Sequence, residues 1–251
     1  MTRFMSARFG LHLRSSVVNT KFCQVEDPQN LTQITCSGFG YPSINNCSGW
    51  CGLNSCHPIL QQRYNLNMQL HLSSILELLA SEGHRQYGGE AVSQLEHALQ
   101  CANLAQINGA TPELITACLL HDLGHLLDLP HPDLALLEEI DDRHEYVASI
   151  QLQSLFTIEV TEPIRLHVEA KRYLCAVETD YFSALSPASQ HSLGLQGGIF
   201  LPTEAATFME LPHAFSAVQL RRWDEQAKVP GAVTPALNDF LPYLQHCLQL
   251  Y

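Results

Sequence analysis

The 251 residues are enough for one large domain or two small ones, and the 46% hydrophobic content supports a sizeable core. No apolar run is long enough to cross a bilayer, so a membrane span is not expected. The net charge of −12 is uneven: five basic and two acidic residues precede Met68, and eight basic and twenty-three acidic residues follow from there. An acidic body argues against nucleic-acid binding, which depends on Lys and Arg contacts to phosphates.

Residues 1–67 differ from the rest of the chain. They are rich in Ser, Asn, Gly and Cys, and no segment has the periodicity of an amphipathic helix. The first 22 residues carry four basic and no acidic side chains, which fits either an organellar transit peptide or translated upstream sequence. We predict that residues 1–67 are a disordered or non-native extension, and that the functional domain spans residues 68–251.

The nine cysteines divide at the same point. The four after Met68 fall in helical patterns without paired spacing, which is typical of small buried apolar residues in a reducing, cytoplasmic compartment. The five earlier ones raise the alternative of a zinc knuckle, although their spacing matches no compact zinc module. Its ligands would be Cys47, Cys51, Cys56 and His57.

Helical patterns begin at Met68. Apolar residues recur at helical spacing up to Leu79, and a second helix follows the Tyr87–Glu90 turn and carries His97. Thr111 before Pro112 predicts the start of a third helix, which we expect to continue through His125 before prolines break it.

The remaining patterns are also helical. A fourth helix is expected from Arg143 to Leu155, and a fifth from Thr161, with His167 and Lys171 one turn apart. Ser186–Pro187 starts another that bears Ser189 and Ser192 and ends at Gly197–Gly198, and further helices cover Leu220–Asp224 and follow Pro235. No alternating strand pattern persists, so the predicted fold is all-α.

Histidine and aspartate recur inside these apolar helices. His121 and His125 are expected on one face of the third helix, with Asp122 between them, and burying such groups is costly unless a charge pairs with them. One such position is usually a satisfied core residue, but five successive helices that each present His or Asp indicate a site for a pair of metal ions. The candidate ligands are His97, His121, Asp122, His144, His167 and Asp224.

Several short motifs make a family resemblance specific. They are Tyr87–Glu90, Gln94–His97, Leu119–His125, His167–Leu174, Gln196–Gly198 and Trp223–Glu225. Together with the ligand pattern, they resemble the HD-domain superfamily of metal-dependent phosphohydrolases and diiron oxygenases, and within it the small HD-domain oxygenases of organophosphonate catabolism. The resemblance covers roughly residues 70–235 and implies an HD-domain helical bundle.

The resemblance also implies an activity. One iron would be held by His97, His121, Asp122 and Asp224, and the other by Asp122, His144 and His167. Such oxygenases use a mixed-valent Fe(II)/Fe(III) pair and O2 to abstract the C1 hydrogen and cleave the C–P bond. The expected substrate is a 1-hydroxy-2-(amino or trimethylammonio)ethylphosphonate, with phosphate and glycine or glycine betaine as products.

Residues around the metals receive roles by the same resemblance. Lys171, His125, Ser189 and Ser192 would bind the phosphonate; Tyr87 would block an iron position until substrate arrives, and Glu90 would meet the ammonium end. From the residues alone, Lys171 could equally be a solvated helix position and Glu90 a first-turn acid favoured by the helix dipole. The same ligands would also serve a phosphohydrolase, and a catalytically silent HD module that binds a small ligand is a third alternative. The sequence does not define the oligomeric state.

Overall fold

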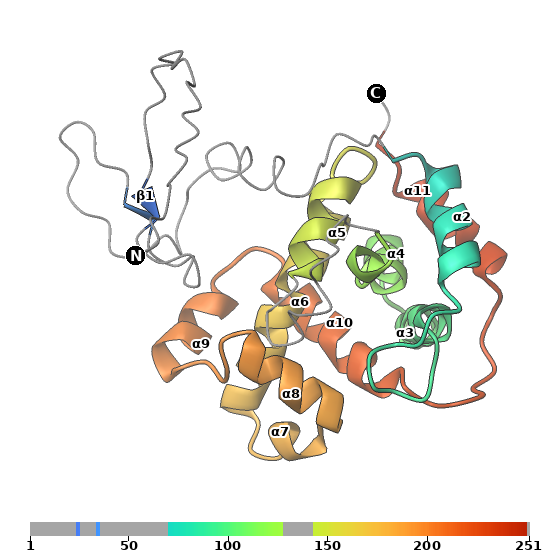
Figure 1. The fold of residues 1–251 in the computed structure, drawn as a ribbon. Coiled ribbons are helices and arrows are strands. Elements are labelled where there is room, and N and C mark those ends of the chain that lie inside the picture. The colour runs from blue at the N-terminus through green and yellow to red at the C-terminus, as the bar shows by residue number, and fades with distance from the viewer. Residues whose placement is uncertain (1–23, 26–33, 36–69, 128–142, 250–251) are drawn as a thin grey trace, which may run out of the picture. The chain divides into compact units, whose positions relative to one another are not determined.

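The computed structural model describes residues 24–25, 34–35, 70–127 and 143–249 (Figure 1). Contacts divide the chain into two units, Met1–Pro58 and Ile59–Tyr251. In the first, strands β1 (Gln24–Val25) and β2 (Ile34–Thr35) pair antiparallel, with Gln24 opposite Thr35. The predicted character of residues 1–67, and the zinc-knuckle alternative within them, otherwise lie outside the described residues.

The described part of the second unit is helical, which confirms the all-α prediction. None of its helices is both long and apolar enough to cross a membrane. In chain order they are α2 (Leu72–Glu82), α3 (Gln94–Ile107), α4 (Pro112–Leu120), the 3-10 turn η1 (Leu123–His125), α5 (His144–Leu152), α6 (Ile158–Val177), α7 (Tyr181–Ala184), α8 (Pro187–Leu195), α9 (Pro202–Met209), α10 (Ala214–Gln226), the 3-10 turn η3 (Leu237–Phe240) and α11 (Leu241–His246).

Local capping explains where several helices begin. The Ser93 hydroxyl accepts from the Glu96 backbone N–H and the Glu96 carboxylate accepts from the Ser93 N–H, a capping box that starts α3. The Thr111 side chain caps α4, and Ser186 caps α8, each followed by proline at the first helical position. The predicted starts of α4 and α8 are therefore confirmed.

The predicted start of α6 and end of α5 were wrong. Helix α6 begins at Ile158 rather than Thr161, with Pro163 inside it. A proline in the second turn removes one intrahelical hydrogen bond, and burial of Ile164 and its apolar neighbours offsets that loss. Helix α5 ends at Leu152 rather than Leu155; a turn follows it, and the Leu155 carbonyl accepts from the Gln249 backbone N–H at 2.8 Å.

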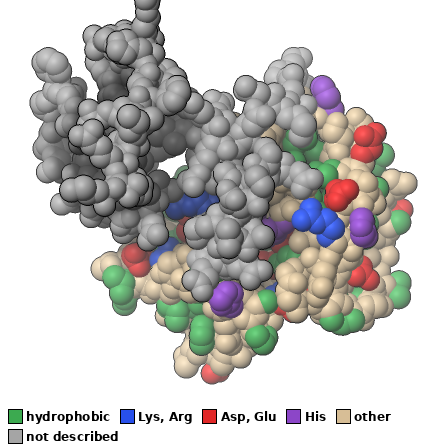
Figure 2. All heavy atoms as spheres, viewed as in Figure 1, with side chains coloured by type: hydrophobic (Ala, Val, Ile, Leu, Met, Phe, Trp, Pro, Cys, Tyr) green, Lys and Arg blue, Asp and Glu red, His purple; other side chains and the backbone are tan. Residues whose placement is uncertain are grey.

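The long helix α6 lies at the centre of the core. It packs against α4, α5 and α10, and α3 packs against α4 and α10, as Figure 1 shows. Among the predicted core cysteines, Cys101, Cys118 and Cys247 are buried and Cys175 is half-buried, all as free thiols. On the face drawn in Figure 2, acidic side chains are dispersed over the described surface, in keeping with the acidic composition. This packing brings one side of α3, α4, α5, α6 and α10 together.

Candidate metal centre

The third predicted helix stops earlier than its pattern indicates. Helix α4 ends at Leu120, Asp122 leaves the helical conformation (φ −100°, ψ 12°), and η1 follows. The prediction that His121 and His125 share one helix face was therefore wrong. Instead, the His125 ring stacks on that of His144, with centroids 4.0 Å apart. The turn frees the Asp122 side chain from the α4 face and points it between neighbouring helices.

Four buried histidines from four segments form two pairs. His97 of α3 and His121 have their Nε2 atoms 3.2 Å apart, and His144 of α5 and His167 of α6 also have theirs 3.2 Å apart. All four side chains are at most 8% exposed. The sequence separates the members of each pair by more than twenty residues, so helix packing creates both contacts.

Backbone carbonyls fix the tautomer of three of these rings. The Nδ1 atom of His97 lies 2.9 Å from the Ala227 carbonyl, that of His121 2.9 Å from Cys118, and that of His167 2.7 Å from Ile164. A carbonyl can only accept, so each Nδ1 carries the hydrogen and each neutral ring presents its Nε2 lone pair. Two Nε2 lone pairs 3.2 Å apart are unfavourable unless a proton or a cation lies between them, and a metal ion there would take both as ligands.

Asp122 lies between the two pairs. Its Oδ2 is 3.6 Å from Nε2 of His97 and 3.3 Å from that of His121. Its Oδ1 is 3.3 Å from Nε2 of His144 and 3.6 Å from that of His167. Within the described residues, Oδ1 has no hydrogen-bond partner. One oxygen facing each pair is the arrangement of a carboxylate that bridges two ions.

Asp224 of α10 completes the first pair. Its Oδ1 lies 3.5 Å from Nε2 of His97 and has no hydrogen-bond partner among the described residues, while Oδ2 accepts from Arg221. Two groups can each hold an ion, with ligand atoms within 4.8 Å of one another: His97, His121 and Asp122, and Asp122, His144 and His167. Imidazole and carboxylate ligands with orphaned acceptor oxygens fit a pair of transition-metal ions.

The electrostatics of the centre favour a bound cation. Burial lowers the pKa of His97 to about 4, so this ring is a neutral ligand at pH 7. At His121 burial acts in the same direction, but the Asp122 and Asp224 carboxylates outweigh it and raise the pKa to about 10. The Asp122 and Asp224 carboxylates thus stabilise a positive charge here. A bound metal ion would supply that charge and displace the proton from His121.

Tyr87 reaches the same place from the turn before α3. Its ring stacks on that of His97, with centroids 3.9 Å apart and planes 10° apart. Burial raises the pKa of the phenol, and Asp122 and Asp224 raise it further, so the hydroxyl is neutral. Glu90, three residues on, accepts from the Ser186 hydroxyl and pairs with Lys228 at 3.3 Å. The Tyr87–Glu90 turn therefore contacts both the histidines and the polar residues beyond them.

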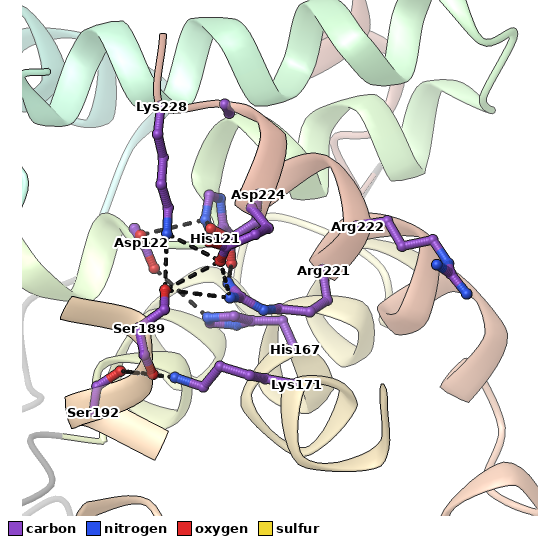
Figure 3. A network of polar contacts seen from close by, with 12 residues as sticks. His121, Asp122, His167, Lys171, Ser189, Ser192, Arg221, Arg222, Asp224 and Lys228 are labelled. Carbon is purple, nitrogen blue, oxygen red and sulfur yellow. Dashed lines mark hydrogen bonds and ion pairs between the residues drawn. The ribbon is translucent and has the colours of Figure 1, made fainter. Parts of the chain in front are cut away.

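A group of three cations lies between α10 and α8: Arg221 donates to Asp224, Lys228 reaches Ser189, and Lys171 reaches Ser192 (Figure 3). We call it the cationic cluster. Lys171 is 4% exposed and donates from Nζ to the Ser192 hydroxyl at 2.8 Å; Lys228 donates to the Ser189 hydroxyl, also at 2.8 Å. Burial lowers the pKa of Lys171 to about 8, and the charges of Arg221 and Lys228 contribute. Ammonium groups beside serine hydroxyls can donate hydrogen bonds to an anion.

Sequence reasoning did not assign a site role to three residues of this region, Arg221, Glu225 and Lys228. Arg221 donates to Asp224 and Glu225, and Lys228 pairs with Glu225 at 3.0 Å. Spacing could have found Arg221, because residues three and four apart in a helix share a face, as Arg221 does with Asp224 and Glu225. Lys228 lies two residues beyond the end of α10, so helical spacing does not point to it. The structure brings all twelve predicted site residues into this one region. They are Tyr87, Glu90, His97, His121, Asp122, His125, His144, His167, Lys171, Ser189, Ser192 and Asp224.

Comparison with known proteins identifies relatives. No protein-family model matches the chain. It is 48% identical over 178 residues to hydroxymethylphosphonate dioxygenase of Gimesia maris, covering 71% of this chain and 88% of that protein. It is 37% identical over 182 residues to the glycine-betaine-forming 1-hydroxy-2-(trimethylamino)ethylphosphonate dioxygenase of Leisingera caerulea, covering 70% and 92%.

A third relative has no assigned activity. It is an uncharacterized protein of Acanthamoeba polyphaga mimivirus, 32% identical over 170 residues, which are 66% of this chain and 78% of that protein. The resemblance to HD-domain phosphonate oxygenases is thus confirmed by two relatives that are named dioxygenases and are matched over most of their own length. This chain belongs to the family of phosphonate dioxygenases.

Proposed function

We propose that the chain is an oxygenase that uses O2 and two iron ions to cleave the C–P bond of a small hydroxyalkylphosphonate and release phosphate. One observation carries the proposal. Two buried histidine pairs flank Asp122, and the cationic cluster lies directly beside Asp224, in a chain 48% identical to a phosphonate dioxygenase. A metal pair next to an anion pocket is what oxidation of a phosphonate at C1 requires.

The metal ligands divide into two sets. One ion would be held by His97, His121, Asp122 and Asp224, and the other by Asp122, His144 and His167. When bound there, a Fe(II)/Fe(III) pair would supply redox chemistry with O2. The Nδ1–carbonyl hydrogen bonds hold three of the histidine rings in the ligating tautomer, so little reorganisation is needed on binding.

The cationic cluster would bind the phosphonate. Lys171 lies one helical turn from His167, and Arg221 nearly one turn from Asp224, so an anion held by both stays next to the metals. Ser189 and Ser192 would donate hydroxyl hydrogen bonds, and His125, stacked on His144, would add a further donor. In this arrangement the C1 end of a bound phosphonate would face the metal ligands.

The Tyr87–Glu90 turn would control access. Tyr87 stacks on His97 beside Asp122, where a phenol blocks the approach to the metals until substrate displaces it. Glu90 would offer a counter-charge to an ammonium group, provided that Lys228 and Ser186 release it. The names of the two relatives cover substrates with and without a quaternary amine, so the amine substituent is left to experiment.

Paired assays test the function. Full-length protein loaded anaerobically with iron would be given hydroxymethylphosphonate, 1-hydroxy-2-aminoethylphosphonate or its trimethyl derivative. Oxidation of hydroxymethylphosphonate by one O2 balances as formate plus phosphate, so we expect one O2 consumed per phosphate released, and a mixed-valent diiron EPR signal perturbed by substrate. Phosphate release from phosphoesters without O2 uptake would instead establish a phosphohydrolase.

Replacing Lys171 with alanine should chiefly weaken substrate binding. Its ammonium is a buried point charge whose bond to Ser192 places it in the cationic cluster. Loss of a charge-assisted contact that is made equally in the ground and transition states should raise KM by about tenfold or more and change kcat little. Steady-state phosphate release measures both constants. An unchanged KM would remove Lys171 from the phosphonate site.

The pH dependence of substrate binding should follow Lys171. Its pKa is lowered to about 8 by burial first and by Arg221 next. The protonated form attracts the anion, so kcat/KM should be steady below this pKa and fall as pH rises through it. In Lys171→Arg the side chain stays charged, and that alkaline decline should disappear. A wild-type kcat/KM that is flat across this range would contradict the assignment.

A further inference from the structure

Helix α8 carries the serines of the anion pocket, yet few of its residues are buried. Among its nine residues only Ser189 and Leu193 are buried. Apolar burial therefore contributes little to its position. Polar contacts hold its N-terminal end, where the Glu225 carboxylate accepts from the Ser186 backbone N–H at 3.0 Å. The placement of its other end must come from elsewhere.

Arg172 of α6 holds the segment that follows α8. Its Nε donates to the Gly198 carbonyl at 2.7 Å and its Nη2 to the Gly197 carbonyl at 3.0 Å. The guanidinium also lies over the Phe200 ring, 4.3 Å from its centroid. Gly197 has φ +96°, and a Cβ there would lie 3.1 Å from Arg172 Nη2. The Gly197–Gly198 pair thus leaves room for the arginine to reach both carbonyls.

Arg172 is also the chain neighbour of Lys171. The Lys171 ammonium bonds the Ser192 hydroxyl, and Ser192 lies in the last turn of α8, five residues before Gly197. Both contacts therefore join the same end of α8 to adjacent residues of α6. A planar guanidinium that binds two carbonyls at once defines an orientation, which a single flexible lysine contact does not.

We propose that Arg172 is a positioning residue for anion binding: it fixes the C-terminal end of α8 on α6, so that Ser192 and Ser189 face the cationic cluster. It does not itself touch the anion in this role. The identity of the anion as a phosphonate rests on the proposed function. The positioning role is independent of it and is measurable with inorganic phosphate.

The test compares Arg172→Met, which keeps the aliphatic stem, with the wild-type full chain, both loaded with iron. We expect the KM for hydroxymethylphosphonate and the Kd for inorganic phosphate by calorimetry to rise about tenfold, as for loss of one charge-assisted hydrogen bond. The kcat, iron content and melting temperature should change little. The KM and phosphate Kd of Arg172→Lys should lie between those of the wild type and Arg172→Met, because lysine keeps the charge but cannot donate to two carbonyls from a planar guanidinium.

Arg222→Met is the matched control. Arg222 of α10 lies partly exposed and pairs with Glu178, so this variant loses the same charge without touching α8. Its KM and phosphate Kd should equal those of the wild type. Each measurement is repeated at about 0.5 M salt, which screens a long-range charge effect but not a misplaced serine. A loss that vanishes in salt, or that appears equally in Arg222→Met, would overturn the proposal.

A double-mutant cycle with Ser192→Ala makes the test specific. If Arg172 acts by placing Ser192, the two substitutions should be clearly less than additive in the phosphate Kd, whereas additive losses would refute the placement role. Should Arg172→Met not fold, Arg172→Lys enters the cycle in its place. If no phosphonate is cleaved but phosphate binding still depends on Arg172 in this way, the proposed function fails and the positioning role stands. Wild-type protein that does not bind phosphate would overturn the positioning role.

Discussion

The Asp122→Ala variant is expected to lose both metal ions and all measurable activity together. Each Asp122 oxygen faces a different histidine pair, so one substitution removes a ligand from both ions. Loss of a residue that only supports a metal ligand lowers metal affinity or activity about 10–100-fold, so loss of a shared ligand should lower both by more than about 100-fold. Iron per chain, measured by atomic emission, and phosphate release check the two effects in parallel.

Asp180→Ala provides the comparison for this variant. Asp180 is an exposed aspartate before α7 whose side chain makes no capping hydrogen bond, so its loss should leave iron content and activity at wild-type values. Full iron occupancy in Asp122→Ala would refute the bridging assignment. Loss of one ion with retention of the other would show that Asp122 serves a single site.

Gly124→Ala should disrupt the metal centre without removing any ligand. A Cβ at this position would lie 2.2 Å from the His144 carbonyl oxygen, a backbone atom at the start of α5. The clash must push α5 away from η1 and carry His144 away from Asp122. Overpacking of this kind costs about 1–3 kcal/mol in the free energy of unfolding. The urea concentration at the midpoint of unfolding and the iron content should both fall. The ion held by His144 and His167 should be lost first.

Gly194→Ala is the opposite case. Gly194 is an exposed residue inside α8, and a Cβ there meets no atom within 4 Å. Alanine in an open helical position stabilises by up to about 1 kcal/mol, so this variant should be as stable as the wild type or slightly more so. If Gly124→Ala kept its full iron content and stability, the close approach of η1 to α5 would not be needed for the site.

Local signals accounted for most of the helices. Thr111–Pro112 and Ser186–Pro187 mark helix starts because a hydroxyl caps free N–H groups and proline lacks the donor that a first turn leaves unused. The same reasoning misplaced the start of α6, because it treated Pro163 as a first-turn residue. Burial of the surrounding apolar face decided that boundary, and burial is a property of the folded chain.

The candidate ligands were also recognisable locally, but their arrangement was not. His121 and Asp122 stand out as polar residues in an apolar run, whereas the break after Leu120 that separates His121 from His125 is marked only by Gly124, which a helix can also tolerate. The cationic cluster was anticipated only at Lys171. Helical spacing relates Arg221 to Asp224, but the contacts of Arg221 and Lys228 with Ser189 come from the packing of α8 against α10 and the residues after it, which periodicity does not reveal.

The sequence by itself determined the all-α character, the chemical identity of the ligand side chains and the resemblance to phosphonate oxygenases, because helical periodicity, capping and residue type are local properties. Tertiary structure alone decided that one aspartate faces both histidine pairs, and that the Ala227 carbonyl orients His97 from 130 residues away. Contacts between residues so distant in sequence depend on how whole helices pack. That packing is set by the combined burial of many side chains rather than by any single motif.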